Sequence, residues 1–134
     1  MRQLHFQPIA GKALDIVDVI RHTPEVASCK EQTNVLRMVC EELVVNVVDY
    51  AYPDGSDGYL DVEIEKDADS ITIRLKDGGV AFNPLETGMP DITKPLEERQ
   101  IGGLGIFITL KKMDEVNYEY INNENILTIK KWLH

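Results

Sequence analysis

Glu42 and Asn46 stand four residues apart in a segment with helical periodicity. Side chains at this spacing lie about one turn apart on the same face of a helix. A carboxylate can accept a proton from an attacking hydroxyl group, and a neutral amide oxygen can coordinate Mg²⁺. The pair therefore predicts a general base, Glu42, beside a metal ligand, Asn46. Two polar residues on a solvent-exposed helix face would give the same pattern, and Glu41 could serve as an ordinary surface acid as well as Glu42 could.

Asp77 follows a run with strand character and precedes Gly78 and Gly79. A carboxylate at the end of a strand can accept a hydrogen bond from the exocyclic amine of adenine, a contact that guanine cannot supply. Gly79 has no Cβ, so the backbone there could approach a base closely. A strand-ending turn would explain the same three residues. Taken alone, this segment leaves both interpretations open.

A third segment, residues 102–105, is rich in glycine and precedes a run with helical character. Free N–H groups at a helix N-terminus bind phosphate. No Gly-Lys-Ser/Thr follows, so the segment is not a P-loop, and its glycine spacing does not fit the dinucleotide-binding fingerprint. A flexible joint between a loop and a helix is the structural alternative.

Hydrophobic periodicity predicts an α+β two-layer sandwich, with helices on one face of a mixed, mostly antiparallel sheet. Thr33 or Asn34 is expected to cap the main helix, and Pro24 to break or restart the first one. A long segment between Gly78 and Gly103 has little periodicity and predicts a functional lid or a mobile segment. The expected strands are residues 4–9, 60–65, 71–75, 116–120 and 127–129, and the expected helices are residues 12–21, 33–50 and 104–113. The second and third strands are expected to form an antiparallel hairpin, and the last two a second hairpin across a turn at residues 122–125.

Length and composition narrow the classes of protein. The chain has 134 residues, of which 43% are hydrophobic, and this predicts a single folded domain over residues 1–134. A formal net charge of -9, without a basic cluster, argues against nucleic-acid binding. No signal peptide or run of about 20 apolar residues is present, so we expect a soluble cytoplasmic protein that does not bind membranes. Cys29 and Cys40 are expected to be reduced, half-buried thiols.

Together, the three segments resemble the anti-sigma-factor serine kinases, a branch of the histidine-kinase-like ATPase superfamily that also includes gyrase. The resemblance covers nearly the whole chain and implies the Bergerat-type ATPase fold. The matching pieces are residues 42–46 with 50–52, residues 77–84, and residues 102–107.

The resemblance implies roles for individual residues. Asn46 would bind Mg²⁺, and Glu42 would be the general base. Asp77 would contact adenine, with Gly79 and Phe82 beside it. Further contacts to ATP would come from the glycine segment, which consists of Gly102, Gly103, Leu104 and Gly105. Arg99, at the end of the lid, would stabilise charge on the transferring phosphoryl group. Many relatives carry a histidine where Tyr50 stands, so a contact that depends on an imidazole is lost here.

The implied cofactors are ATP and Mg²⁺, and the implied reaction is transfer of the γ-phosphoryl group to a serine of a small anti-sigma antagonist of STAS type. The resemblance also allows a sigma factor as a second partner and a homodimer. A different class of function stays open, in which the chain is a non-catalytic module that regulates transcription. In that case the nucleotide would order the lid and thereby control partner binding without phosphoryl transfer.

Overall fold

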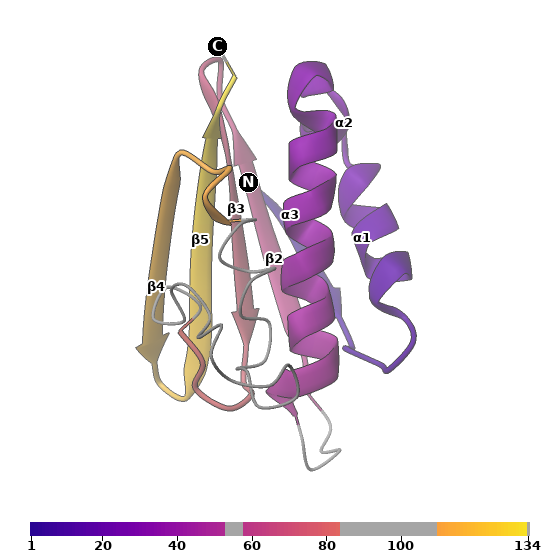
Figure 1. Ribbon diagram of the computed structural model, residues 1–134, viewed down its shortest axis with the longest axis vertical. Helices are drawn as coiled ribbons and strands as arrows, with labels where there is room; N and C mark the ends of the chain where they lie inside the picture. Colours follow the sequence, from indigo (N-terminus) through magenta and orange to yellow (C-terminus); the bar gives the residue numbers. More distant parts are fainter. Residues whose placement is uncertain (53–57, 84–109, 134) are drawn as a thin grey trace, which may run out of the picture.

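The computed structural model describes residues 1–52, 58–83 and 110–133. These residues form a two-layer structure, with a five-stranded sheet on one side and helices packed against one of its faces (Figure 1). The strand order is β1-β2-β3-β5-β4, and every pairing is antiparallel. The strands are β1 (Arg2–Phe6), β2 (Leu60–Lys66), β3 (Ser70–Asp77), β4 (Glu115–Ile121) and β5 (Glu124–Trp132).

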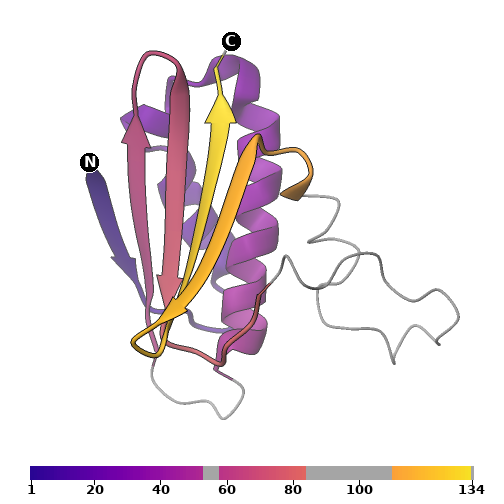
Figure 2. The same cartoon turned by 90° about the vertical axis from the view of Figure 1, so that its left-hand side faces the viewer.

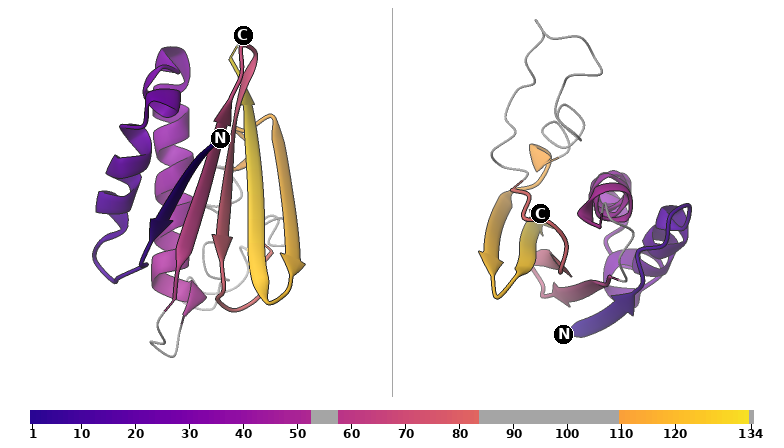
Figure 3. Two further views of the ribbon diagram at one scale, coloured as in Figure 1. Left: turned by 180° about the vertical axis from the view of Figure 1, so that it is seen from behind. Right: turned by 90° about the horizontal axis from the view of Figure 1, so that it is seen from below.

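The helical layer contains α1 (Ala13–Arg21), α2 (Pro24–Ala27), the 3₁₀ turn η1 (Lys30–Gln32), α3 (Thr33–Asn46) and the π-helical turn η2 (Val47–Ala51). Figure 2 shows the strands in front with α3 behind them, and Figure 3 shows from below that the helices lie on a single face of the curved sheet. The expected α+β two-layer fold is confirmed, and in the described part of the chain the sheet is antiparallel throughout.

The core follows from the two periodicities of the sequence. On β2, Leu60, Val62 and Ile64 point toward the helices and are fully buried, while the residues between them are more exposed. On α3 the buried residues recur at helical spacing, so one stripe of the helix faces the sheet. These helix residues are Leu36, Val39, Cys40, Leu43 and Val44.

The first strand was expected at residues 4–9, but β1 covers Arg2–Phe6. Its partner strand explains the difference, because Phe6 pairs with Leu60, the first residue of β2. Beyond Phe6 the chain has no β2 residue to pair with, and Pro8 has no N–H group to donate. Pro24 does restart the helix: it is the first residue of α2, and the Thr23 hydroxyl accepts a 3.4 Å hydrogen bond from the Val26 N–H.

The start of α3 differs from the expected side-chain cap. Gln32 occupies the N-cap position without a capping hydrogen bond, since η1 leads directly into the helix. The Thr33 hydroxyl instead donates to the carbonyl oxygen of Cys29 at 3.0 Å. The helix ends near the expected residue, because α3 stops at Asn46 and η2 continues to Ala51.

The two hairpins were expected, but the second turn is tighter than the sequence suggested. Asn122 and Asn123 both have positive φ, at 56° and 62°, which is the signature of a two-residue type I′ turn. Glu124 and Asn125, expected in this turn, therefore belong to β5. Of the helix expected at residues 104–113, residues 104–109 lie outside the described ranges, Leu110 is helical, and a turn follows it.

Both cysteines are free and buried, more deeply than expected. Burial raises the pKa of the Cys40 thiol to about 12, so this side chain stays protonated at neutral pH. No helix within the described ranges is long and apolar enough to cross a membrane.

Candidate functional site

A cavity of about 160 Å³ lies between the end of α3 and the neighbouring ends of β3 and β5. Most of its lining is apolar, and the lining also includes the polar side chains of Asn46, Asp77 and Asn125. Apolar walls with a few polar groups are typical of sites that bind small organic ligands. The remaining wall residues are Leu43, Val47, Tyr50, Ala51, Leu75, Val80, Ala81, Phe82, Tyr118 and Leu127.

Asp77 is the last residue of β3 and continues the inward-facing series of Ile73 and Leu75. It is only 7% exposed. Its Oδ1 atom accepts hydrogen bonds from the Gly79 N–H and from Asn125 Nδ2, both at 3.0 Å. Within the described part of the chain both bonds use Oδ1, so Oδ2 can accept a hydrogen bond from a ligand.

The electrostatics of Asp77 reflect two opposing effects. Burial raises the pKa of its carboxyl group above the ordinary value, and the hydrogen bonds from Asn125 and Gly79 act in the opposite direction. The negative charge of Glu124 adds to the upward shift of the pKa. The two donors therefore partly offset the cost of burying an ionised carboxylate.

Asn46 lies at the end of α3, where its side chain is fixed by its own helix. Nδ2 donates a 2.7 Å hydrogen bond to the carbonyl oxygen of Glu42. The other amide atom, Oδ1, is buried and has no hydrogen-bond partner among the described residues. A buried acceptor without a partner costs free energy, and a bound cation would remove that cost. A hard oxygen at this position fits Mg²⁺, which uses few protein ligands and keeps several waters.

Glu42 and Glu41 differ in their surroundings. Glu41 pairs with Arg37 at 3.5 Å, as residues four apart on a helix surface do. The Glu42 carboxylate has no ion pair within the described ranges and lies one turn before Asn46. It does not line the cavity itself. Glu42 thus remains the better candidate for the base, because its carboxylate is not engaged elsewhere in the described structure.

Close packing of the backbone requires a glycine at position 79, which the sequence alone did not indicate. A Cβ at this position would lie 2.3 Å from the carbonyl oxygen of Ala51, and the next residue, Val80, donates a 2.8 Å hydrogen bond to the same oxygen. The absence of a side chain therefore lets the turn after β3 lie directly against the end of η2. This contact holds Asp77 and Asn46 on two sides of one cavity.

Replacing Gly79 by alanine is expected to lower the free energy of unfolding by about 1–3 kcal/mol, because the added methyl group must displace backbone atoms. Urea denaturation would measure the loss, and nucleotide titration should show weaker binding. Gly11→Ala is the comparison: Gly11 has a positive φ of 83° but nothing within 4 Å of an added Cβ. It should lose stability through backbone strain alone and keep its nucleotide affinity. Equal affinity in both variants would contradict this role of Gly79.

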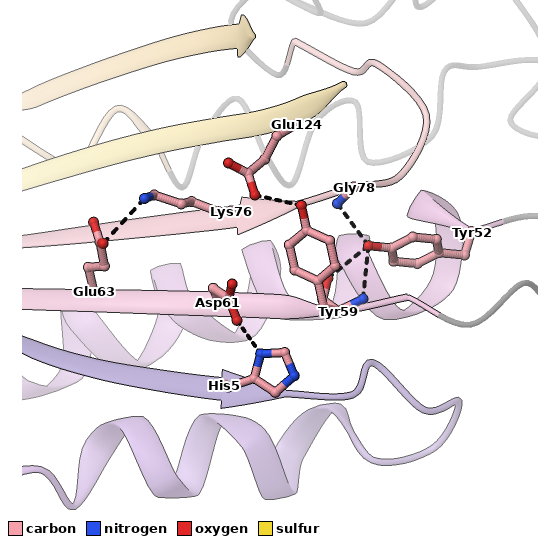
Figure 4. Close-up of polar contacts among 8 residues, drawn as sticks. All are labelled: His5, Tyr52, Tyr59, Asp61, Glu63, Lys76, Gly78 and Glu124. Atoms are coloured by element: carbon pink, nitrogen blue, oxygen red, sulfur yellow. Dashed lines mark hydrogen bonds and ion pairs between the residues drawn. The ribbon is translucent and has the colours of Figure 1, made fainter. Parts of the chain in front are cut away.

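Tyr52 fixes the same turn from the other side (Figure 4). Its hydroxyl group donates to the carbonyl oxygen of Tyr59 at 2.8 Å and accepts from the N–H groups of Tyr59 and Gly78, at 3.0 and 2.9 Å. One phenol thus joins the end of η2, the start of β2 and the turn after β3. The sequence marked Tyr52 only as part of a matching segment, with no role of its own.

The uncovered face of the sheet is polar. The Tyr59 hydroxyl group donates a 2.5 Å hydrogen bond to the Glu124 carboxylate, and the His5 ring is hydrogen-bonded to the Asp61 carboxylate (Figure 4). Further along the same face, Lys76 pairs with Glu63 at 3.2 Å. Asp61, Glu63 and Glu124, three carboxylates of this face, are thus each engaged by a neighbouring side chain.

The predicted site residues fall into three groups. Asn46, Asp77 and Phe82 line the cavity, Glu42 and Gly79 lie next to residues that line it, and five residues lie outside the described ranges. These five are Arg99, Gly102, Gly103, Leu104 and Gly105. Tyr50 lines the cavity and is 43% exposed.

Sequence reasoning missed Asn125, the third polar residue of the cavity. The buried residues Leu127 and Ile129 alternate with half-buried residues on β5, and two positions before Leu127 the same face carries Asn125. A polar residue at an inward-facing position is the signal that could have identified it, as Asp77 was identified after Leu75. The assumed four-residue turn hid this signal.

Comparison with known proteins agrees with the fold. The model of the histidine kinase-like ATPase domain family matches residues 15–131, and the chain belongs to this family. It is 31% identical over 100 residues to the serine-protein kinase RsbW of Listeria monocytogenes, and this match covers 71% of this chain and 63% of that protein. To the anti-sigma F factor of Clostridium beijerinckii it is 25% identical over 104 residues, covering 76% of this chain and 73% of that protein.

A more distant relative is the serine/threonine-protein kinase BtrW of Bordetella bronchiseptica, at 22% identity over 94 residues, covering 70% of this chain and 66% of that protein. The chain spans less than two thirds of the length of the Listeria kinase, with 63% covered. Family membership therefore establishes the ATPase-type domain, and the activity and partners of the whole protein are matters for proposal.

Proposed function

We propose that the protein is an ATP-dependent serine/threonine kinase of the anti-sigma regulatory type. Its substrate would be a serine on a small antagonist protein of STAS type. The observation that carries this proposal is that one cavity holds a buried carboxylate, Asp77, and a buried amide oxygen, Asn46 Oδ1, that has no hydrogen-bond partner in the described part of the chain. Relatives named as serine-protein kinases and an anti-sigma factor support the same function.

In this mechanism adenine occupies the cavity, and its exocyclic amine donates to Asp77 Oδ2. Asn46 Oδ1 would hold Mg²⁺, and the ion would supply charge neutralisation to the phosphates. Glu42, one turn before Asn46 on α3, accepts the proton of the serine hydroxyl group. The serine oxygen then forms a bond to the γ-phosphorus of ATP, and the bond between the γ-phosphorus and the ADP oxygen breaks. Positioning and charge neutralisation provide most of the rate enhancement.

Residues outside the described ranges have roles in the same proposal. The glycine segment would contact the phosphates through backbone N–H groups, and Arg99 would stabilise charge on the transferring group. The segment consists of Gly102, Gly103, Leu104 and Gly105. We also propose a sigma factor as a second partner, a homodimer as the assembly, and the cytoplasm as the location.

The test is transfer of label from γ-labelled ATP to a STAS-type antagonist encoded next to this chain. We expect labelled antagonist only when Mg²⁺ is present. Antagonist binding that changes between ATP and ADP without any label transfer would instead support the nucleotide-controlled binding module. Calorimetry that detects no binding of ATP at millimolar concentration with Mg²⁺ would reject both.

A further inference from the structure

Asn125 stands directly opposite Asp77 in the sheet, at the end of the face that the helices cover. The two residues are register partners on β5 and β3. Asn125 is 6% exposed and lines the cavity together with Asp77. Its neighbour Glu124 points to the other face of the sheet, where Tyr59 binds it (Figure 4). The strand alternation thus places one amide, and no charged residue of β5, beside the carboxylate.

The amide of Asn125 is fully used by the protein. Nδ2 donates to Asp77 Oδ1 at 3.0 Å and to the carbonyl oxygen of Val80 at 2.9 Å. Oδ1 accepts from the Phe82 N–H at 3.1 Å and from the Tyr118 hydroxyl group. A carboxamide has two donor hydrogens and an oxygen that accepts two hydrogen bonds, so all four positions are occupied. Asn125 therefore has no free position with which to bind a ligand.

The four contacts restrict Asp77 in two ways. A donor on Oδ1 is compatible with an ionised carboxylate, which has only acceptors. The same bond fixes the rotation of the carboxylate, so that Oδ2 is the oxygen available to the cavity. Val80 and Phe82, which also line the cavity, are held by the same amide. One side chain thus sets both the acceptor and the adjacent wall of the base pocket.

We propose that Asn125 is a positioning residue that determines base specificity, because it keeps Asp77 oriented as a hydrogen-bond acceptor toward the ligand. This rests on the proposed function, in which the cavity binds adenine. A base with an amine at position 6 donates to Asp77. A base with a carbonyl group there, as in inosine, presents an acceptor to an acceptor and is rejected.

Asn125→Asp tests the proposal with little change in shape. Two carboxyl groups at hydrogen-bond distance do not both ionise, so they would share a proton, and Asp77 would no longer be held as an acceptor. The other ionisable groups near this pair are Glu124, Tyr118 and Tyr52. The matched control is Asn117→Asp, which makes the same chemical substitution at an exposed position of β4.

The measurement is calorimetric titration of the full chain with ADP and with inosine diphosphate, each with Mg²⁺. The unsubstituted protein should prefer ADP by roughly 10- to 100-fold, the value of one hydrogen bond to a charged group. Asn125→Asp should lower this preference about tenfold, and Asn117→Asp should leave it unchanged. Equal weakening of both nucleotides by Asn125→Asp would show that Asn125 is only structural and would overturn the proposal.

Two further outcomes are separated by the same design. If Asn125→Asp does not fold, as judged by circular dichroism, Tyr118→Phe decides the question. It removes one donor to the amide and should lower the preference about two- to fivefold, the value of a neutral hydrogen bond. An unchanged preference in that variant would overturn the proposal. If the unsubstituted protein binds ADP and inosine diphosphate equally, the specificity inference fails while nucleotide binding stands; if it binds neither, the proposed function fails as well.

Discussion

Replacing Glu42 by glutamine is expected to slow phosphoryl transfer to the antagonist by about 10²- to 10⁴-fold, the usual contribution of a general base. Glutamine has nearly the same shape, but its amide cannot accept the proton of the serine hydroxyl group. The carbonyl oxygen of residue 42, which holds Asn46 Nδ2 at 2.7 Å, is unchanged by the substitution. Metal-dependent nucleotide binding should therefore stay at the level of the unsubstituted protein. Single-turnover transfer from γ-labelled ATP measures the rate, and calorimetry with ADP measures the binding.

Glu41→Gln is the matched control, since it makes the same chemical change one residue earlier. Glu41 pairs with Arg37 at the helix surface, and an exposed pair of this kind contributes about 0.3–0.5 kcal/mol to stability. Transfer by this variant should be close to normal. If Glu42→Gln transfers phosphate at the normal rate, or if both variants lose activity equally, Glu42 is not the base.

The layers of the fold could be predicted because burial leaves a direct pattern in this sequence. Alternation on β2 and β3, and the helical spacing on α3, each place a continuous apolar surface on one side. Strand ends were less predictable, because they depend on the partner strand. The end of β1 at Phe6 is set by the first residue of β2, which lies far away in the sequence. The helix that contains α3 was expected to begin at residue 33, as it does, but its side-chain cap was mispredicted, because η1 enters the helix directly and no capping bond is formed.

The candidate site was predictable where a residue type carries its own chemistry. Asp77 and Asn46 were both proposed as ligand-binding residues from type and spacing, and both line the cavity. Asn125 and Tyr52 were missed because their importance lies in what they hold. Each forms three or more hydrogen bonds, including bonds to segments that are distant in sequence, and no local pattern records such contacts. Gly79 was singled out, but its contact with Ala51 requires the packed fold.

Replacing Asp77 by asparagine is expected to weaken ADP binding roughly 10- to 100-fold, because a hydrogen bond to a charged acceptor is lost. The amide oxygen of the new side chain can keep the bonds from Gly79 and Asn125 at the former Oδ1 position. The new NH₂ group then takes the place of Oδ2 and presents donors to the donor amine of adenine. Binding of inosine diphosphate, which offers a carbonyl oxygen at that point, should be retained or increased. Calorimetric titration with both nucleotides measures this inversion of preference.

Asp15→Asn removes the same charge from the exposed surface of α1, where Asp15 lies 3.8 Å from Lys12, and should bind both nucleotides normally. This control separates base recognition from the general effect of a less negative chain on a polyanionic ligand. Stability gives a second check with a defined sign. Burial raises the pKa of Asp77, so its ionised form is less stable in the folded protein than in the unfolded chain. A neutral asparagine removes this cost. The substitution should therefore not lower the free energy of unfolding, whereas a loss of packing would lower it. Weaker ADP binding with unchanged stability and a reversed preference would identify Asp77 as the base-recognising acceptor. An unchanged ratio of the two affinities would mean that adenine is held by other groups.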